Sequence, residues 1–341
     1  MDRLEVWLMN ISWQRCESIV ATGELKQHLR YSKIIPGTMK IRSKPSLSDE
    51  ENIDYIENED YIVDYNDGLI QRIASGRIPD WAKHALYGRE NFDHTLYTDY
   101  SNKDYFIYAD YMFEAEGVQL IGEEVVQRKL LDLNKLKSRG MIRYVVFGDS
   151  ISTGAEASGK ERMFFNRFAN LLKKICEVEV EVINKSIGGE DSSGGLMRLE
   201  KDVLALSPDL VSIGYGMNDQ NKIQIGNKIP PNEFGENISN IVRQISEKTN
   251  AEIILLTPCI PNPLWKYTSG DMGLYADQIK MVAKRFGVCV ADVFFLWQQE
   301  LNAGKAHESL LANNINHPND YGHWIYFMAL KSTLAYKQKI V

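Results

Sequence analysis

Cysteine is scarce in this sequence, with four residues among 341. Cys16, Cys176, Cys259 and Cys289 are far apart, and no two form a Cys-x-x-Cys pair. Zinc sites and thiol redox motifs need such close spacing, so neither is predicted. The last three cysteines lie in or beside apolar segments, which is typical of buried thiols. We expect neither a bound metal nor a cofactor.

The sequence also lacks a surplus of basic residues, since its formal net charge is −7 and its pI is about 5.5. Nucleic-acid-binding surfaces are usually basic, so nucleic acid is not expected as a partner. No apolar run approaches the roughly 20 residues of a membrane-spanning helix. Residues 1–7 contain acids where a signal peptide needs a basic and then an apolar stretch. We therefore expect a cytoplasmic protein without a membrane partner, and leave a homo-oligomer open.

Residues 1–130 read as a β-rich domain, because short aromatic and β-branched runs occur without long helical periodicity. The runs 61–65 and 69–70, joined by Asn66-Asp67-Gly68, predict a hairpin. Strands at such short spacing favour a β-sandwich or jelly-roll-like fold. Residues 49–67 hold nine acidic residues and no basic one. A calcium loop is one interpretation, but Gly68 comes one position too early for an EF-hand, so we favour a solvated acidic face.

Residues 131–142 are the predicted linker, and beyond them strands and helices alternate. The pattern predicts strands at 143–147, 178–183, 210–213, 253–256 and 288–290, and helices at 162–175, 196–206, 234–246, 274–286 and 321–336. Such alternation indicates a parallel sheet covered on both faces, a three-layer α/β fold. Ligands of these sheets bind at the carboxyl ends of the strands.

Four polar motifs follow predicted strands or precede the last helix. They are Gly148-Asp149-Ser150, Gly188-Gly189, Gly216-Met217-Asn218-Asp219 and His317. Their residue types suit acyl transfer, because a serine hydroxyl needs a base and histidine titrates near neutral pH. A tetrahedral oxyanion needs compact donors, which the Gly189 N–H, the Asn218 amide and the Ser150 N–H would supply.

In these motifs the sequence resembles the SGNH (GDSL) hydrolase superfamily over roughly residues 143–335. The resemblance rests on Phe147 to Ser150, Asn184 to Gly189, Gly216 to Asp219, and His317-Pro318-Asn319 with Gly322-His323. It implies a flavodoxin-like parallel sheet in a catalytic domain at 143–341, with Ser150 as nucleophile and His317 as base. Gly189 and Asn218 would be oxyanion donors. Some carbohydrate esterases of this superfamily have a preceding β-sandwich, and this layout is similar.

One position departs from the family, which usually has aspartate three residues before the histidine. Here that residue is Asn314. An amide oxygen can accept a hydrogen bond from imidazole but cannot neutralise imidazolium, and losing the triad aspartate costs a serine protease roughly 10⁴ in rate. The sequence leaves open a triad with Asn314, a Ser–His dyad, or a carboxylate from elsewhere, such as Asp320 or Asp292.

Several residues have structural interpretations that compete with functional ones. Asp149 and Asp219 are expected to brace loops, and His323 to pack or cap. Trp265 and Trp297 fit core packing as well as an acceptor surface. The aromatic-rich first domain and the lack of an apolar flap favour a short acyl ester of a carbohydrate, with acetyl preferred. The alternatives are a lipase-like or thioester-cleaving acylhydrolase, an acyltransferase using the same residues, and a carbohydrate-binding protein without activity.

Overall fold

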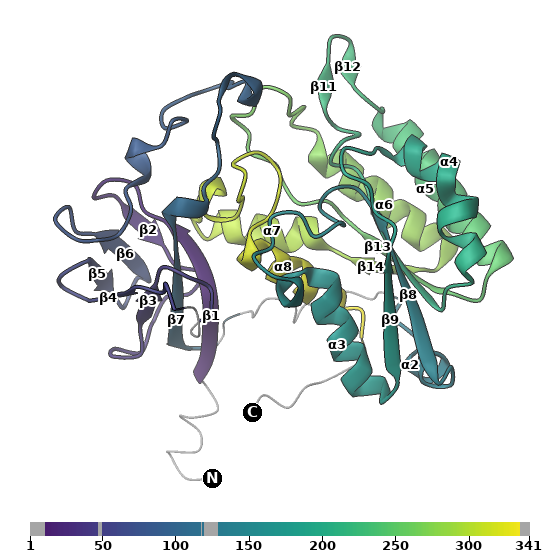
Figure 1. Cartoon of the computed structure of the whole chain (residues 1–341), viewed down its shortest axis with the longest axis horizontal. Helices are drawn as coiled ribbons and strands as arrows, with labels where there is room; N and C mark the ends of the chain where they lie inside the picture. Colours follow the sequence, from purple (N-terminus) through teal and green to yellow (C-terminus); the bar gives the residue numbers. More distant parts are fainter. Residues whose placement is uncertain (1–10, 47–49, 117, 119–128, 335–341) are drawn as a thin grey trace. The chain divides into compact units, whose positions relative to one another are not determined.

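The computed structural model describes residues 11–46, 50–116, 118 and 129–334 (Figure 1). The chain divides into two compact units. Unit 1 comprises Met1–Leu120 and Gln298–Gly322, and unit 2 comprises Ile121–Trp297 and His323–Val341. The chain thus crosses between units within two helices, α7 (Val293–Asn302) and α8 (Asp320–Lys331). The predicted domain end at residue 130 follows residues 119–128, which lie outside the described part.

Unit 1 contains two antiparallel sheets. The first has the order β1-β7-β3-β4, with strands Ile11–Val20, Phe106–Glu114, Lys40–Arg42 and Asp54–Tyr55. The second has the order β2-β6-β5, with strands Lys26–His28, Leu69–Arg72 and Tyr61–Asp64. Strands β5 and β6 pair antiparallel, which confirms the predicted hairpin.

The two sheets of unit 1 share one core, as the prediction of a β-sandwich-like domain requires. Ile19, Ile41 and Tyr111 of the first sheet join Tyr61 and Ile70 of the second in a single buried cluster. Strand β7 contributes Ile107, Ala109, Tyr111 and Phe113 to this cluster, which are alternate positions and therefore lie on one face of the strand.

The acidic stretch of unit 1 is largely a solvated surface, as predicted. Five of its acids are exposed, namely Glu50, Glu51, Asp54, Glu59 and Asp67. Asp60 differs, because it is buried and its carboxylate lies 2.6 Å from Nη2 of Arg77. Hydrogen bonds from Arg77 lower the pKa of Asp60 to about 2. Among the described residues, no group of three or more His, Cys, Asp or Glu side chains could hold a metal ion.

The Asp60–Arg77 pair predicts an acid-sensitive contribution to folding stability. A carboxyl whose pKa is lower in the folded state stabilises above its unfolded value near 4, and loses that effect as pH falls toward 2. Arg77→Gln should therefore be less stable than wild type at pH 6, by a margin that shrinks below pH 4. Urea unfolding from pH 6 to pH 2.5 measures this margin, and a margin independent of pH would contradict the assignment.

Unit 2 is built on a five-stranded parallel sheet with the order β14-β13-β10-β8-β9. The strands are Cys289–Ala291, Glu252–Leu256, Leu210–Gly214, Met141–Gly148 and Glu179–Asn184. Counted along the chain the order is 2-1-3-4-5, the flavodoxin-like order, which confirms the predicted fold class. The central strands are buried on both faces, as their continuous apolar sequences require.

Helices cover both faces of this sheet. Figure 1 shows α4 (Ser192–Asp202), α5 (Pro231–Lys248) and α6 (Met272–Phe286) on one face and α3 (Phe164–Cys176) on the other. The apolar side of α3 buries Phe164, Phe168 and Leu172, which recur every fourth residue. Residues 131–142 contain the short helix α2 (Leu133–Lys137) and the first residues of β8.

Three helices differ from the sequence prediction. Helix α8 ends at Lys331, before the predicted end at residue 336. Helix α4 begins at Ser192 rather than near residue 196, because the Asp191 side chain accepts a hydrogen bond from the Gly194 N–H and caps it. Helix α7 is absent from the sequence prediction, since its first five residues are all apolar and show no helical alternation.

The remaining elements are short. A small antiparallel pair joins β11 (Lys222–Ile223) to β12 (Gly226–Asn227). The 3-10 helices span Trp81–Lys83, His94–Leu96, Lys103–Tyr105, Lys160–Arg162, Leu204–Leu206 and His307–Ser309. Within the described ranges, no helix is both long and apolar enough to cross a membrane.

Candidate active site

Ser150 lies in the turn that follows β8, at the carboxyl edge of the parallel sheet. The turn needs Gly148, because a Cβ there would lie 2.3 Å from the Gly214 carbonyl oxygen of neighbouring β10. The Asp149 N–H donates to that same carbonyl at 3.2 Å. Close approach of the two strands thus fixes the backbone on which the predicted nucleophile stands.

The two aspartates of the motifs brace the loops around Ser150. The Asp149 carboxylate accepts from the Ile151 N–H at 2.9 Å. Asp219 accepts from the backbone N–H groups of Ser192 at 3.0 Å and Gly216 at 3.1 Å. Burial raises the pKa of Asp149 to about 7 and that of Asp219 to about 6. These contacts agree with the loop-bracing role expected from the sequence.

The loop after β9 brings Gly188 and Gly189 beside the serine. The N–H groups of Lys185 and Ile187 donate to carbonyls of β8, at Val146 and Gly148 respectively. A Cβ built on Gly188 would lie 3.9 Å from the Ser150 side chain, and one on Gly189 would meet no atom within 4 Å. Gly189 also has φ of +75°, which strongly favours glycine. Gly189 is exposed, and the space beside its Cα is open.

Asn218 stands on the loop after β10. The turn requires glycine at Gly216, whose φ is +119°. The Asn218 side-chain amide donates to the backbone carbonyl of Glu190 at 3.0 Å, and Glu190 directly follows Gly189. Three predicted site residues, Ser150, Gly189 and Asn218, thus lie on three loops at one edge of the unit 2 sheet.

His317 and Asn314 belong to unit 1, on the segment between α7 and α8. The backbone N–H of His317 donates to Asn313 Oδ1 at 2.8 Å, and its carbonyl accepts from the Ala312 N–H at 2.8 Å. The side chain of His317 is partly exposed, whereas Asn314 is buried with a left-handed φ of +56°.

The amide of Asn314 is engaged by the first part of the chain. Asn102 Nδ2 donates to Asn314 Oδ1 at 3.3 Å and to the Leu311 carbonyl at 2.8 Å. Asn102 Oδ1 in turn accepts from the Trp81 indole N–H at 2.8 Å. Asn102 is fully buried, so this part of the β-rich unit holds the backbone of the histidine segment.

The contacts of four residues that could have been either functional or structural favour a structural role. His323 is buried, stacks on Phe164, and has its Nε2 3.0 Å from the Ala155 carbonyl. Asp292 forms an ion pair with Lys280 at 3.2 Å. Trp265 and Trp297 are both buried, which favours core packing over an acceptor surface.

The structure shows three further residues in contact beside the motif loops, which the sequence did not single out, namely Glu190, Arg198 and Tyr215. Arg198 Nε lies 2.7 and 2.9 Å from the two carboxylate oxygens of Glu190, and Tyr215 Oη donates to Glu190 at 2.7 Å. Arg198 lies on a predicted helix, where a charged residue is usually solvent-exposed. The only sequence signal for these residues was that Glu190 directly follows Gly189.

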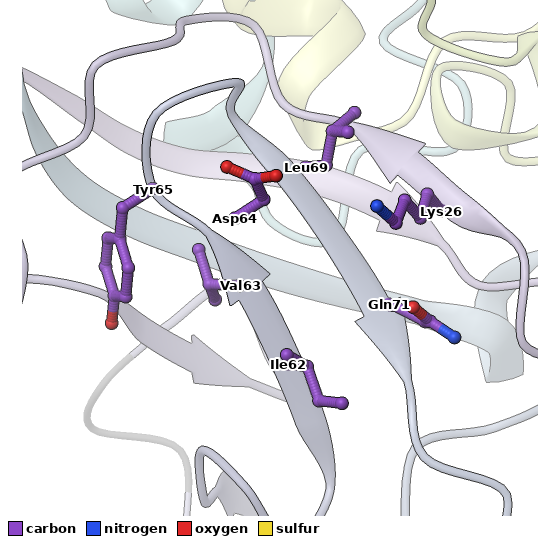
Figure 2. Close-up of a pocket in the computed structure, with 7 residues that line it drawn as sticks. All are labelled: Lys26, Ile62, Val63, Asp64, Tyr65, Leu69 and Gln71. Atoms are coloured by element: carbon purple, nitrogen blue, oxygen red, sulfur yellow. The ribbon is translucent and has the colours of Figure 1, made fainter.

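A separate pocket of about 410 Å³ lies on the three-stranded sheet of unit 1 (Figure 2). Its lining combines polar and apolar side chains from β2, β5, β6 and the turn between β5 and β6, including Lys26, Ile62, Asp64, Tyr65 and Gln71. None of the predicted catalytic residues lines it. The residues that line this pocket include no nucleophile with an adjacent base.

Residues 146–325 match the family described as GDSL-like lipase/acylhydrolase. The chain belongs to this family. The match covers more than half of the chain and spans every predicted site residue from Ser150 to His317. The resemblance to the SGNH (GDSL) superfamily is thereby confirmed.

Individual proteins similar to this GDSL-family chain share less than 30% of its residues over the matched parts. The Bacillus subtilis (strain 168) protein described as uncharacterized lipoprotein YqeF is 29% identical over 126 residues. Those residues are 37% of this chain and 51% of that relative, so the chain spans about half of its length.

Solved acetylxylan esterases share the fold. A variant of Axe2 from Geobacillus stearothermophilus, in which isoleucine replaces one tryptophan, is 23% identical with a TM-score of 0.50, covering 59% of this chain and 97% of its own. Unmutated Axe2 is 24% identical with a TM-score of 0.49, and the match covers 57% of this chain and 95% of Axe2.

Proposed function

We propose that this protein is a serine esterase that removes short acyl groups, with acetyl preferred, from a carbohydrate. The observation that carries the proposal is the family match over residues 146–325, which includes all four motifs in order. The arrangement of Ser150, Gly189 and Asn218 at one sheet edge supports it, because acyl transfer needs a nucleophile beside oxyanion donors. The carbohydrate is carried over from the acetylxylan esterases that share the fold.

In the proposed mechanism His317 takes the proton from Ser150 Oγ as the oxygen attacks the ester carbonyl. The N–H groups of Gly189 and Ser150 and the amide of Asn218 donate to the oxyanion. Collapse of the tetrahedral intermediate breaks the ester C–O bond, and His317 gives its proton to the leaving alcohol. Water, deprotonated by His317, then attacks the acyl-serine and releases the acid. No metal or cofactor takes part in these steps.

Asn314 is proposed to support His317, either directly as a third member or by fixing the backbone of its loop. The hydrogen bond from Asn102 to Asn314 Oδ1 favours the second role, because one lone pair of that oxygen is already used. A Ser–His dyad with a backbone-held histidine is therefore our working mechanism.

The acyl preference is tested with p-nitrophenyl esters of two, four and eight carbons, beside acetylated xylooligosaccharides. We expect kcat/KM to fall at least tenfold from acetyl to octanoyl, and acetate to be released from the oligosaccharides. Ser150→Ala supplies the background rate. Activity that rises with chain length would favour a lipase-like or thioester-cleaving enzyme, and acylated product with an added sugar acceptor would favour an acyltransferase.

We further propose a cytoplasmic location. All four cysteines lie in the described part of the chain and none forms a disulfide, which suits a reducing compartment. The Bacillus relative is described as a lipoprotein, so a membrane-attached form is the alternative. Recovery of the protein in the membrane fraction of its native cells would overturn the cytoplasmic assignment.

A further inference from the structure

Arg198 of α4 joins the two ends of the loop that carries Gly189. Its Nη1 lies 2.5 Å from the backbone carbonyl of Lys185, where the loop begins. Its Nε and Nη2 bind the carboxylate of Glu190, where the loop ends. A planar guanidinium can make both contacts at once, whereas a lysine ammonium lacks this fork of donors.

Arg198 is also linked to Asn218, the second predicted oxyanion donor, through Glu190. Glu190 accepts from Arg198 through its carboxylate and from the Asn218 amide through its backbone carbonyl. One N–H of the Asn218 amide is thereby fixed, which sets the direction of the other. Tyr215 directly follows β10, at the start of the loop that carries Asn218. It donates to Glu190 and lies 3.1 Å from Arg198 Nη2.

The guanidinium also contacts the strand that carries the nucleophile. It lies over the ring of Phe147, 4.3 Å from the ring centroid, and Phe147 directly precedes Gly148-Asp149-Ser150. The side chains of Arg198 and Glu190 are only 14% and 11% exposed. Their contacts are therefore shielded from solvent and stronger than those of a surface pair.

We propose that Arg198 is a positioning residue that holds the Gly189 and Asn218 donors in the geometry required by the oxyanion. This inference rests on the proposed esterase function. In this proposal Arg198 acts through Glu190 and Lys185, which it contacts directly. Because oxyanion donors act on charge that develops in the transition state, its loss lowers kcat more than it raises KM.

The test is Arg198→Ala, assayed with p-nitrophenyl acetate. Losing a single oxyanion donor costs about 10²–10³ in kcat, and we expect a loss of at least 10² with KM changed less than threefold. Millimolar guanidinium should restore at least part of the lost kcat, whereas methylammonium, which lacks the planar fork, should restore less. A kcat within threefold of wild type would overturn the proposal.

Arg143→Ala is the matched control. Arg143 also donates to a backbone carbonyl, that of Leu206 at 2.7 Å, and pairs with Glu181 at 3.3 Å. It stands near the start of β8, away from the carboxyl edge that carries Ser150. We expect the control to keep wild-type kcat. Equal losses of kcat in both variants, without rescue by guanidinium, would show a general effect on folding and overturn the positioning role.

If Arg198→Ala does not fold, Glu190→Gln replaces it. This change keeps the side-chain shape but removes the charge that binds Arg198, and we expect kcat to fall at least tenfold in a folded protein. Unchanged kcat there would overturn the inference. A wild-type protein without esterase activity would instead reject the proposed function, so the two failures are distinguishable.

Discussion

Ser150→Ala should lower kcat for p-nitrophenyl acetate by about 10⁴-fold or more, and His317→Ala should do nearly the same. Removing either group abolishes formation of the acyl-enzyme, and the residual rate would come from binding and the oxyanion donors alone. The double variant should be scarcely worse than either single variant, because the two residues act as one unit. Burst and steady-state kinetics of the purified proteins measure these losses.

Ser193→Ala is the matched serine control. Ser193 lies in the first turn of α4, near the same sheet edge, and its Oγ accepts from Asn237. It should keep wild-type activity. Turnover by Ser150→Ala at the wild-type rate would reject the serine mechanism at this site. In the same assay Asn314→Ala tests whether that residue supports His317 at all, since unchanged kcat would show that Asn314 does not orient His317.

Lys305→Met should destabilise the folded protein by about 3–5 kcal/mol, the usual cost of removing one partner from a buried ion pair. Lys305 Nζ lies 2.5 Å from Glu17 Oε1 and 3.1 Å from the Ser18 carbonyl, and both charged side chains are almost fully buried. Glu300 is buried nearby and pairs with Arg30 at 3.0 Å. Without Lys305, a single cation would serve two buried carboxylates.

The pH dependence and a paired variant check this prediction. Burial raises the pKa of Glu300 to about 7, against an ordinary value of 4.5, and Lys305 opposes that rise. A raised carboxyl pKa favours folding as pH falls, so the deficit of Lys305→Met should shrink from pH 8 to pH 5. Glu17→Gln combined with Lys305→Met should recover most of the stability. Urea unfolding measures both, and an equal deficit in the double variant would contradict the buried-pair explanation.

The sequence predicted the α/β fold of unit 2 well, because its signals are local. Strands β8 and β10 are short apolar runs that end in glycine-containing motifs, and α3 has an apolar residue every fourth position. Helix α7 was not predicted because Val293 to Trp297 are all apolar and have no polar face, although only Val293, Leu296 and Trp297 are buried. Periodicity cannot distinguish such a segment from a strand.

The supporting contacts could not be predicted, because they join residues that are remote in sequence. Glu17 and Lys305 are separated by 288 positions, and Asn102 and Asn314 by 212. Arg198 resembles a solvent-exposed helix residue until the fold places it over Phe147. The motifs at the strand ends and their resemblance to the GDSL family identified the candidate nucleophile, base and oxyanion donors, whereas the contacts around them required the three-dimensional structure.

Unit 1 is built from two separate segments of the chain, and this affects the order in which the protein can fold during synthesis. Its β-sheets precede residue 120, but residues 298–322 complete it with Lys305 and the Asn102-bound segment. At about 5–20 residues per second, translation of the intervening residues 121–297 takes roughly 10–35 s. Throughout that interval Glu17 and Asn102 lack their partners on the nascent chain. Of the two units, the one whose β-strands are synthesised first is therefore completed only after residues 121–297 of the other have been made.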